Sequence, residues 1–185
     1  MIATALYNNL KRIVLLIVLA IGAASAMAQR IALKTNTLYL ATASPNIETE
    51  FRMGKHFTLD LSVAGNFSTI NGNQLHFQQV SPELRYWFSR PMARHFVGVT
   101  TSGTNYNFRF KDHAYDGDAL AAGFTYGFDW VISRRWNLET SIGAGMLKYR
   151  CFDYKEGEVK PLSPNKDKTI FAPIKLGLTI SYILY

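Results

Sequence analysis

The sequence predicts an all-β protein that folds as an eight-stranded antiparallel up-and-down β-barrel with a filled polar lumen. Beyond residue 29, apolar residues alternate with polar or small ones at a period of two, and no segment keeps the helical period of 3.6 for long. Several alternating segments exceed the five or six residues usual in soluble sheets. Their connections alternate between short and long, as in barrels with two different ends.

The N-terminal segment is set apart from this pattern. Lys11 and Arg12 precede an apolar run over residues 13–24, and the small residues "AASAMAQ" follow. This order is typical of a cleaved signal peptide. A membrane anchor is disfavoured because a spanning helix needs about 20 apolar residues. We therefore predict a signal peptide over residues 1–28 and one domain over residues 29–185.

The composition argues against a fold that depends on disulfides and against a nucleic acid partner. Cys151 is the only cysteine, so the fold depends on no intramolecular disulfide. Loss of Lys11 and Arg12 with the signal peptide would lower the formal net charge from +7 to +5. No nucleic acid partner is expected for an exported chain that is only mildly basic.

Eight strands are expected in chain order. The ranges are 31–41, 46–53, 56–68, 75–89, 95–108, 118–132, 135–150 and 169–184. In the sixth range, large aromatic residues occupy every second position and glycine, threonine or aspartate stands between them. Most ranges reach the 9 to 11 residues with which a tilted strand crosses a bilayer.

Short basic turns are expected to alternate with longer polar loops between the strands. Basic turns "MGKH", "SRPMAR" and "SRR" are expected after the second, fourth and sixth strands. Longer polar loops "STINGNQ", "RFKDHAYDGD" and "CFDYKEGEVKPLSPNKDK" are expected after the third, fifth and seventh. Phe57, Phe96 and Trp136 each follow a basic turn, 39 and 40 residues apart, at the level where an interfacial aromatic belt is expected.

The alternation leaves open which face is inside, because a soluble barrel and a membrane barrel have opposite orientations. Bulky residues stand on one face throughout, and so many would overfill an eight-stranded barrel. Glycine recurs on the other face, where it suits a crowded interior better than a solvated strand. We therefore predict a transmembrane barrel. Its expected lipid-facing and belt residues are Phe57, Phe88, Phe124, Tyr126, Phe128, Trp130, Trp136 and Tyr182.

Charges of both signs lie on the glycine-bearing face. Buried unpaired ions cost several kcal/mol each, so an interior position implies a paired ion network rather than an open channel. The predicted network comprises Lys34, Glu48, Glu50, Arg52, Asp60, Glu83, Arg85, Asp129, Glu139 and Lys175. The alternative is a soluble exported ligand-binding barrel, in which the same charges are solvated.

The C-terminal strand "KLGLTISY", residues 175–182, resembles the terminal-strand signal that barrel-assembly machinery recognises in outer-membrane proteins. The matching positions are Lys175, Gly177, Ile180 and Tyr182. The chain continues beyond them with "ILY". The barrel-assembly machinery is therefore an expected partner.

Several segments, among them "ALKTNTLYLATASPNIETEF", "PELRYWF" and "APIKLGLTISYI", resemble a family of short bacterial outer-membrane barrels catalogued as a domain of unknown function. The resemblance covers nearly the whole predicted domain. It implies a barrel of the outer-membrane protein A or X type in the Gram-negative outer membrane, with some members encoded near fimbrial or adhesin genes. It supplies no catalytic motif.

We considered an enzyme as the main alternative function. His113 lies near Asp112, Asp116 and Asp118, and Ser102 and Thr104 on the preceding strand are candidate partners for a hydrolase or lipid-modifying site. The acidic spacing does not match a calcium loop. We predict no catalytic, cofactor or metal site. A narrow pore is a further alternative.

The sequence thus predicts an integral outer-membrane protein with a structural or surface-interaction role in adhesion, fimbria association or envelope integrity. Expected partners are outer-membrane lipid, lipopolysaccharide, and fimbrial or other surface proteins that contact the exposed loops.

Overall fold

A computed structural model describes residues 30–70, 73–110, 113–155, 161 and 163–184. The predicted signal peptide, residues 1–28, lies outside the described residues. Ile31–Tyr185 form a compact unit of their own, and the fold below is that of this unit.

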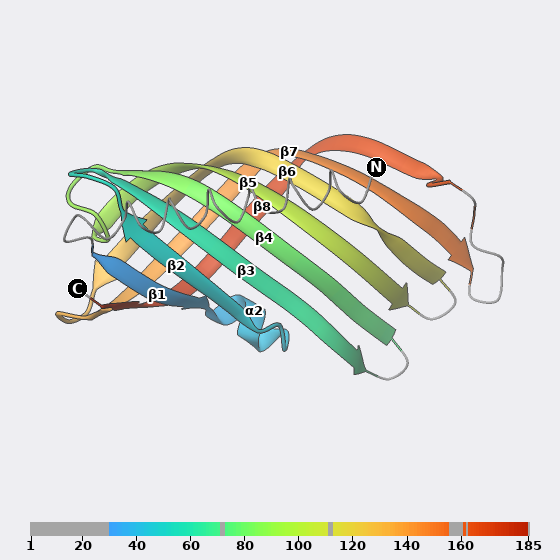
Figure 1. The fold of residues 1–185 in the computed structure, drawn as a ribbon, viewed down its shortest axis with the longest axis horizontal. Coiled ribbons are helices and arrows are strands. Elements are labelled where there is room, and N and C mark those ends of the chain that lie inside the picture. The colour runs from blue at the N-terminus through green and yellow to red at the C-terminus, as the bar shows by residue number, and fades with distance from the viewer. Residues whose placement is uncertain (1–29, 71–72, 111–112, 156–160, 162, 185) are drawn as a thin grey trace, which may run out of the picture. The chain divides into compact units, whose positions relative to one another are not determined.

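Eight antiparallel strands follow one another in chain order around a closed, hydrogen-bonded ring (Figure 1). The ring closes where β1 pairs with β8 and Leu33 lies opposite Tyr182. The all-β class, the number of strands and their order are therefore confirmed. The elements are β1 (Ile31–Asn36), α2 (Thr37–Ala41), β2 (Asn46–Arg52), β3 (Phe57–Ile70), β4 (Asn73–Trp87), β5 (Arg94–Phe110), β6 (His113–Val131), β7 (Trp136–Lys155) and β8 (Lys166–Ile183).

The first predicted strand, 31–41, is wrong in its second half, which forms α2. Asn36 caps this short helix, because its side-chain oxygen accepts a hydrogen bond from the Leu38 backbone N–H at 3.1 Å. β1 and β2 are consequently six and seven residues long, whereas β3 to β8 have 14 to 20 residues. No helix among the described residues is long and apolar enough to span a membrane.

Two of the three predicted long loops are mostly strand. β3 and β4 remain paired until Ile70 meets Asn73, and β5 and β6 until Phe110 meets His113. A strand ladder is made by backbone groups, so polar segments can extend a hairpin beyond its apolar part. The prediction of loops in these two polar segments is therefore mostly wrong, because the paired strands continue through most of each segment.

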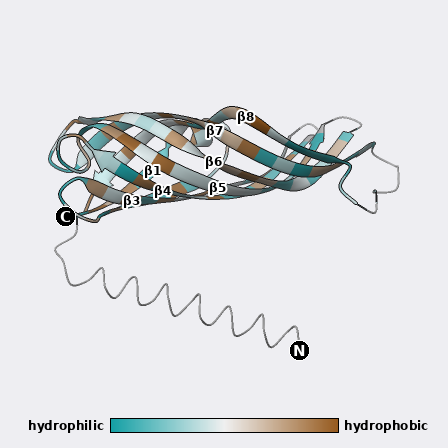
Figure 2. Ribbon diagram, turned by 90° about the horizontal axis from the view of Figure 1, so that it is seen from above, coloured by the Kyte–Doolittle hydropathy of each residue, from teal (hydrophilic) through white to brown (hydrophobic). Residues whose placement is uncertain are grey.

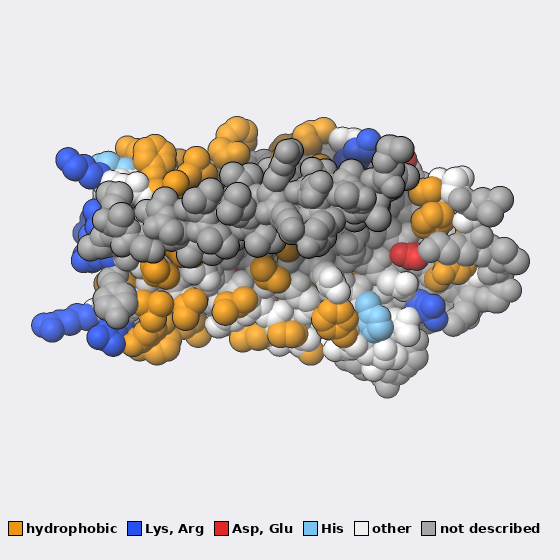
Figure 3. All heavy atoms as spheres, viewed as in Figure 1, with side chains coloured by type: hydrophobic (Ala, Val, Ile, Leu, Met, Phe, Trp, Pro, Cys, Tyr) orange, Lys and Arg blue, Asp and Glu red, His pale blue; other side chains and the backbone are white. Residues whose placement is uncertain are grey.

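Successive side chains of each strand point to opposite faces, and most inward ones are polar or small while most outward ones are apolar. In β6, Thr125 and Asp129 are buried, whereas Phe124 is 75% exposed. The alternation is visible along the ribbons in Figure 2, and Figure 3 shows hydrophobic side chains spread over the outer surface. The predicted lipid-facing residues lie outward, with Phe57, Phe88, Phe124, Tyr126, Trp130 and Trp136 exposed and Phe128 and Tyr182 half-exposed.

Glycines leave space for large inward side chains that come from neighbouring strands. A Cβ atom on Gly127 would collide with the buried Phe96 ring. One on Gly98 would lie 2.6 Å from Glu83 Oε1 and 2.5 Å from Thr125 Oγ1. Gly103 lies on the same strand as Gly98, and a Cβ atom there would meet nothing within 4 Å.

Gly98→Ala is therefore expected to destabilise the fold by about 1 to 3 kcal/mol, because the added methyl group overpacks the interior. Gly103→Ala is the matched control on the same strand and should change stability by less than about 0.5 kcal/mol. The measurement is equilibrium unfolding followed by β-sheet circular dichroism. Equal unfolding midpoints for the two variants would contradict the close packing at Gly98.

Candidate functional site

A row of carboxylates crosses three neighbouring strands inside the ring. Glu50 on β2 lies opposite Asp60 on β3, and Asp60 lies opposite Glu83 on β4. Like charges directly opposite one another destabilise a sheet. The row therefore requires cations placed between its members.

Lys34 supplies the first of these cations from β1. Its Nζ atom lies 2.5 Å from Glu50 Oε2, 2.8 Å from Glu139 Oε2 and 3.4 Å from Asp60 Oδ2. All four side chains are buried. Because Glu139 comes from β7, this ammonium group joins strands on different sides of the ring.

Arg85 supplies the second cation from β4. Its Nη1 atom lies 3.1 Å from Glu50 and 3.0 Å from Glu139, and its Nη2 atom lies 2.5 Å from Asp60 and 3.1 Å from Glu83. Its guanidinium carbon also lies 4.5 Å from the centre of the Phe96 ring. A planar guanidinium with five donors suits such a shared position, since it can serve several carboxylates at once.

Lys175 adds a third cation from β8 and pairs with Glu83. Thr125 donates to the other oxygen of Glu83 at 2.5 Å. Lys175 reaches the interior at a β-bulge, where the β7–β8 register shifts between Gly143 and Ala144. The bulge adds one residue to β8 and re-aims the neighbouring side chains.

The other three residues predicted for the network, Arg52, Asp129 and Glu48, do not take part in these ion pairs. Arg52 is half-buried, and its Nε donates to the Gly54 carbonyl at 2.8 Å, so the prediction that it joins the network is wrong. Asp129 is buried and accepts a hydrogen bond from Asn137 Nδ2 at 2.9 Å. Glu48 is buried, and none of the ion pairs found among the described residues includes it.

An apolar layer lies beside the network at the end of the ring that carries the short turns. Trp87 and Phe96 are fully buried with ring centres 4.7 Å apart, and Trp87 Nε1 donates to Thr58 at 2.8 Å. The turn before β5 places Met92 in the interior, where its carbonyl accepts from Asn137 at 2.8 Å. The expectation that Phe96 joins an outer aromatic belt is therefore wrong, because it lies opposite Gly127 and fills the space that this glycine leaves.

The C-terminal strand places its predicted assembly residues on both faces. Lys175 and Gly177 face inward, whereas Ile180 is exposed. Tyr182 accepts a hydrogen bond from Arg135 Nη1 at 2.9 Å, and its ring centre lies 4.9 Å from that of Trp136.

Among the described residues, the side chains of the alternative hydrolase site do not come together. His113 Nδ1 lies 3.4 Å from Asp153 Oδ1. Thr104 stands six residues before Phe110, the residue paired with His113, which is about 20 Å along a strand. Ser102 is two residues farther away, and Asp112 lies outside the described residues.

Polar contacts instead join the end of β7 to the start of β8. Asn165 Nδ2 donates to the Asp153 carbonyl at 2.7 Å, and the Asp153 N–H donates to Asn165 Oδ1 at 2.9 Å. Lys166 donates to the Asp153 carboxylate, and this bond lowers the pKa of Asp153 and raises the pKa of Lys166. No group of three or more His, Cys, Asp or Glu side chains among the described residues is arranged to hold a metal ion.

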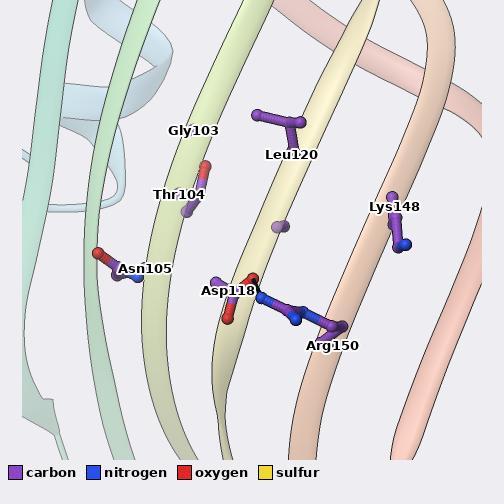
Figure 4. Close-up of a pocket in the computed structure, with 8 residues that line it drawn as sticks. Gly103, Thr104, Asn105, Asp118, Leu120, Lys148 and Arg150 are labelled. Atoms are coloured by element: carbon purple, nitrogen blue, oxygen red, sulfur yellow. Dashed lines mark hydrogen bonds and ion pairs between the residues drawn. The ribbon is translucent and has the colours of Figure 1, made fainter.

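Two cavities lie near polar residues of the long strands. One, of about 570 Å³, is bordered by Asn105, Asp118, Lys148 and Arg150 of β5, β6 and β7, and Arg150 Nη2 lies 3.2 Å from Asp118 Oδ2 (Figure 4). The other, of about 280 Å³, lies between α2, β4 and β8, and buried Glu48 lines it. The alternation of strand residues did not predict the second cavity, because it depends on the helix that interrupts the wall.

A sequence comparison with protein families finds a match over residues 13–184 to a family described as "Protein of unknown function (DUF3575)". The description states no fold, location or activity. Comparison with curated proteins finds no match.

Arg85→Met is expected to destabilise the protein by about 3 to 5 kcal/mol, because it leaves four buried carboxylates to share Lys34 and Lys175. Arg150→Met removes the exposed pair with Asp118 and should cost no more than about 1 kcal/mol. Denaturant unfolding of both variants measures the difference.

Adding Glu139→Gln to Arg85→Met tests whether the loss arises from charge. Glu139 contacts both Lys34 and Arg85, so its neutralisation should recover part of the stability lost in the single variant. A double variant that is less stable than Arg85→Met would refute a role for charge balance.

Proposed function

Since the chain belongs to the DUF3575 family, whose description assigns no activity, we propose from the geometry that it is an integral outer-membrane β-barrel with a structural or surface-interaction role. One observation carries the proposal. The outward face of the ring carries many exposed large apolar side chains, while the charged network is buried inside. A protein that stays dissolved in water rarely exposes an apolar surface of this kind.

The height of the apolar band supports a membrane location. On β6 the outward apolar residues run from Leu120 to Trp130, and on β7 from Trp136 to Met146. Ten residue steps of about 3.4 Å give roughly 34 Å along a strand. At the tilt of about 40° usual in such barrels this projects to roughly 25 Å, the height of the apolar band in outer-membrane barrels.

The borders of the band have the polarity expected of membrane interfaces. At the short-turn end, aromatic side chains gather on the outer surface: the rings of Phe57 and Tyr86 lie 5.3 Å apart, and those of Phe128 and Trp130 lie 4.7 Å apart. At the other border, Leu120 is followed outward by Asp118 on the same strand. Such aromatic girdles occur where strands leave the hydrocarbon.

The interior supports a closed structural barrel rather than a narrow pore. Lys34, Arg85 and their carboxylates join strands across the ring, and Trp87 and Phe96 lie beside them toward the short-turn end. An ion that passed through would have to displace this network. Single-channel conductance above that of an empty bilayer would favour the pore instead.

The parts that extend beyond the apolar band offer the contact surface. Asp118, Lys148 and Arg150 lie outward on strands that continue past the band. Basic groups at this level can meet lipopolysaccharide phosphates, and the strand ends at Asp153 and Lys166 can contact fimbrial or other surface proteins. We assign no catalytic role to His113. Insertion by the barrel-assembly machinery through the C-terminal strand belongs to the same proposal.

The proposal predicts that the protein stays with membranes after washing with high salt and alkaline carbonate. In detergent gels, unheated protein should migrate differently from boiled protein, because a closed barrel resists unfolding at room temperature. Recovery of the processed protein in the soluble periplasmic fraction would contradict the proposal.

Phe124→Arg separates a lipid-facing from a water-facing surface. In a bilayer it should destabilise the barrel by about 2 to 4 kcal/mol, whereas on a water-exposed surface it should be neutral. Asn105→Arg, on the outward face beyond the band, is the control and should have little effect in either case. The measurement is the fraction of heat-modifiable protein formed on refolding into vesicles.

A further inference from the structure

The wall of the ring is incomplete beside α2. β1 and β2 end after six and seven residues, so neither strand accompanies β3 and β8 along their full length. The cavity of about 280 Å³ lies at this level, bordered by Tyr39 of α2, by Gln79 and Ser81 of β4 and by residues of β8. Buried Glu48 and exposed Leu176 both line it, so the cavity lies at the boundary between the interior and the outer surface.

Glu48 is the chemically distinctive group in this cavity. It is 4% exposed, and no described residue donates a hydrogen bond to its Oε2 atom. The cations Lys34 and Arg85 are bound to other carboxylates, and Lys175, which lines the same cavity, is paired with Glu83. A buried carboxylate of this kind is costly unless a cation or donor reaches it.

The charge balance of the interior also indicates that Glu48 lacks a cationic partner. The described interior holds six carboxylates, Glu48, Glu50, Asp60, Glu83, Asp129 and Glu139, and three cations, Lys34, Arg85 and Lys175. Two of the six lie outside the ion pairs. Asp129 has Asn137 as a donor and lies near the sealed short-turn end, whereas Glu48 faces a cavity. Glu48 is therefore the carboxylate available to a ligand.

The lining favours an organic ammonium group over a metal ion. Among the described residues Glu48 is the one carboxylate that lines the cavity, which is few oxygen ligands for a divalent metal ion. Lys175 beside it repels a dication about twice as strongly as a singly charged ammonium group. An ammonium group carries three N–H donors and no acceptor. Glu48 can take one of them and the Ser62 hydroxyl another. A quaternary ammonium has no such donor and could not satisfy Glu48.

The border of the cavity indicates the rest of the ligand. Pro173 and Leu176 line it from β8, and Leu176 is 68% exposed on the outer face. Cavities that hold whole drug-sized ligands begin at roughly 300 Å³, so this one suits a headgroup whose apolar part stays outside.

We infer that this cavity binds the primary ammonium headgroup of an amphiphile, with Glu48 as counter-ion and the apolar chain leaving along Leu176. The position of the chain rests on the proposed membrane location, whereas the ammonium site does not. Both an aminophospholipid and a free ammonium compound have the required headgroup chemistry.

The test is native mass spectrometry and calorimetry of the full mature chain in a non-ionic detergent. Lyso-phosphatidylethanolamine is expected to bind, and lyso-phosphatidylcholine, which lacks N–H donors, is expected to bind about tenfold or more weakly. Equal binding of the two lipids would overturn the inference. Binding of free phosphoethanolamine as tight as that of the lyso-lipid would support the ammonium site and assign it to a soluble ligand.

Glu48→Gln should weaken lyso-phosphatidylethanolamine binding about tenfold or more, since it removes the charge that the ammonium pairs with. Asp167→Asn is the control, because it removes the same charge from an exposed position on β8. Undiminished binding by a folded Glu48→Gln variant would overturn the inference. If that variant does not fold, Leu176→Trp, which narrows the border without changing a charge, should weaken lyso-lipid binding, and unchanged binding would overturn it.

Failure of this inference and failure of the proposed function have different signatures. A protein that stays in membranes but does not distinguish the two lyso-lipids keeps its location and loses the ammonium site. A protein found soluble loses the proposed location, and its binding of phosphoethanolamine through Glu48 is then the remaining test of the site.

Discussion

The rest of the structure depends on the pairing of Lys34 and Arg85 with carboxylates from four other positions in the ring. β2, β3 and β4 bring Glu50, Asp60 and Glu83 to one level, where they would repel one another. Two shared cations turn that repulsion into contacts that join β1, β2, β3, β4 and β7. Buried ion pairs are weak sources of net stability, but removing one partner is costly, so such a network favours a single register over its alternatives.

The same interior explains where the ring is closed and where it is accessible. Toward the short turns, Trp87 and Phe96 pack beside the network. The Phe96 ring fills the space left by the missing side chain of Gly127. Toward the other end, α2 takes the place of longer first and second strands, and a cavity lies beside it. Glu48, a carboxylate outside the ion pairs, lies in this cavity. The short first and second strands therefore determine where the proposed ammonium site lies.

Each difference between the predicted and the observed strands has a physical reason. Residues 37–41 alternate like a strand but follow Asn36, whose side chain can cap a helix, and this local hydrogen bond outweighs the pattern. The segments around Ile70 and Phe110 have loop composition but remain paired, because a ladder needs only backbone groups. Phe96 follows a basic turn as Phe57 does, yet it faces inward, because Gly127 leaves space for its ring.

The sequence alone determined the all-β class, the eight strands and which face of most strands is polar, because side chains alternate at a period of two whatever the neighbouring strands are. It also identified the inward charges apart from Arg52. Only the tertiary structure decided which charges meet. Contacts between Lys34 and Glu139, or between Lys175 and Glu83, join strands that are distant in the chain, and they depend on ring closure and on the bulge in β8. The local sequence pattern does not determine which charged side chains lie within ion-pair distance. For the same reason, only the folded ring shows that Glu48 lies outside the ion pairs.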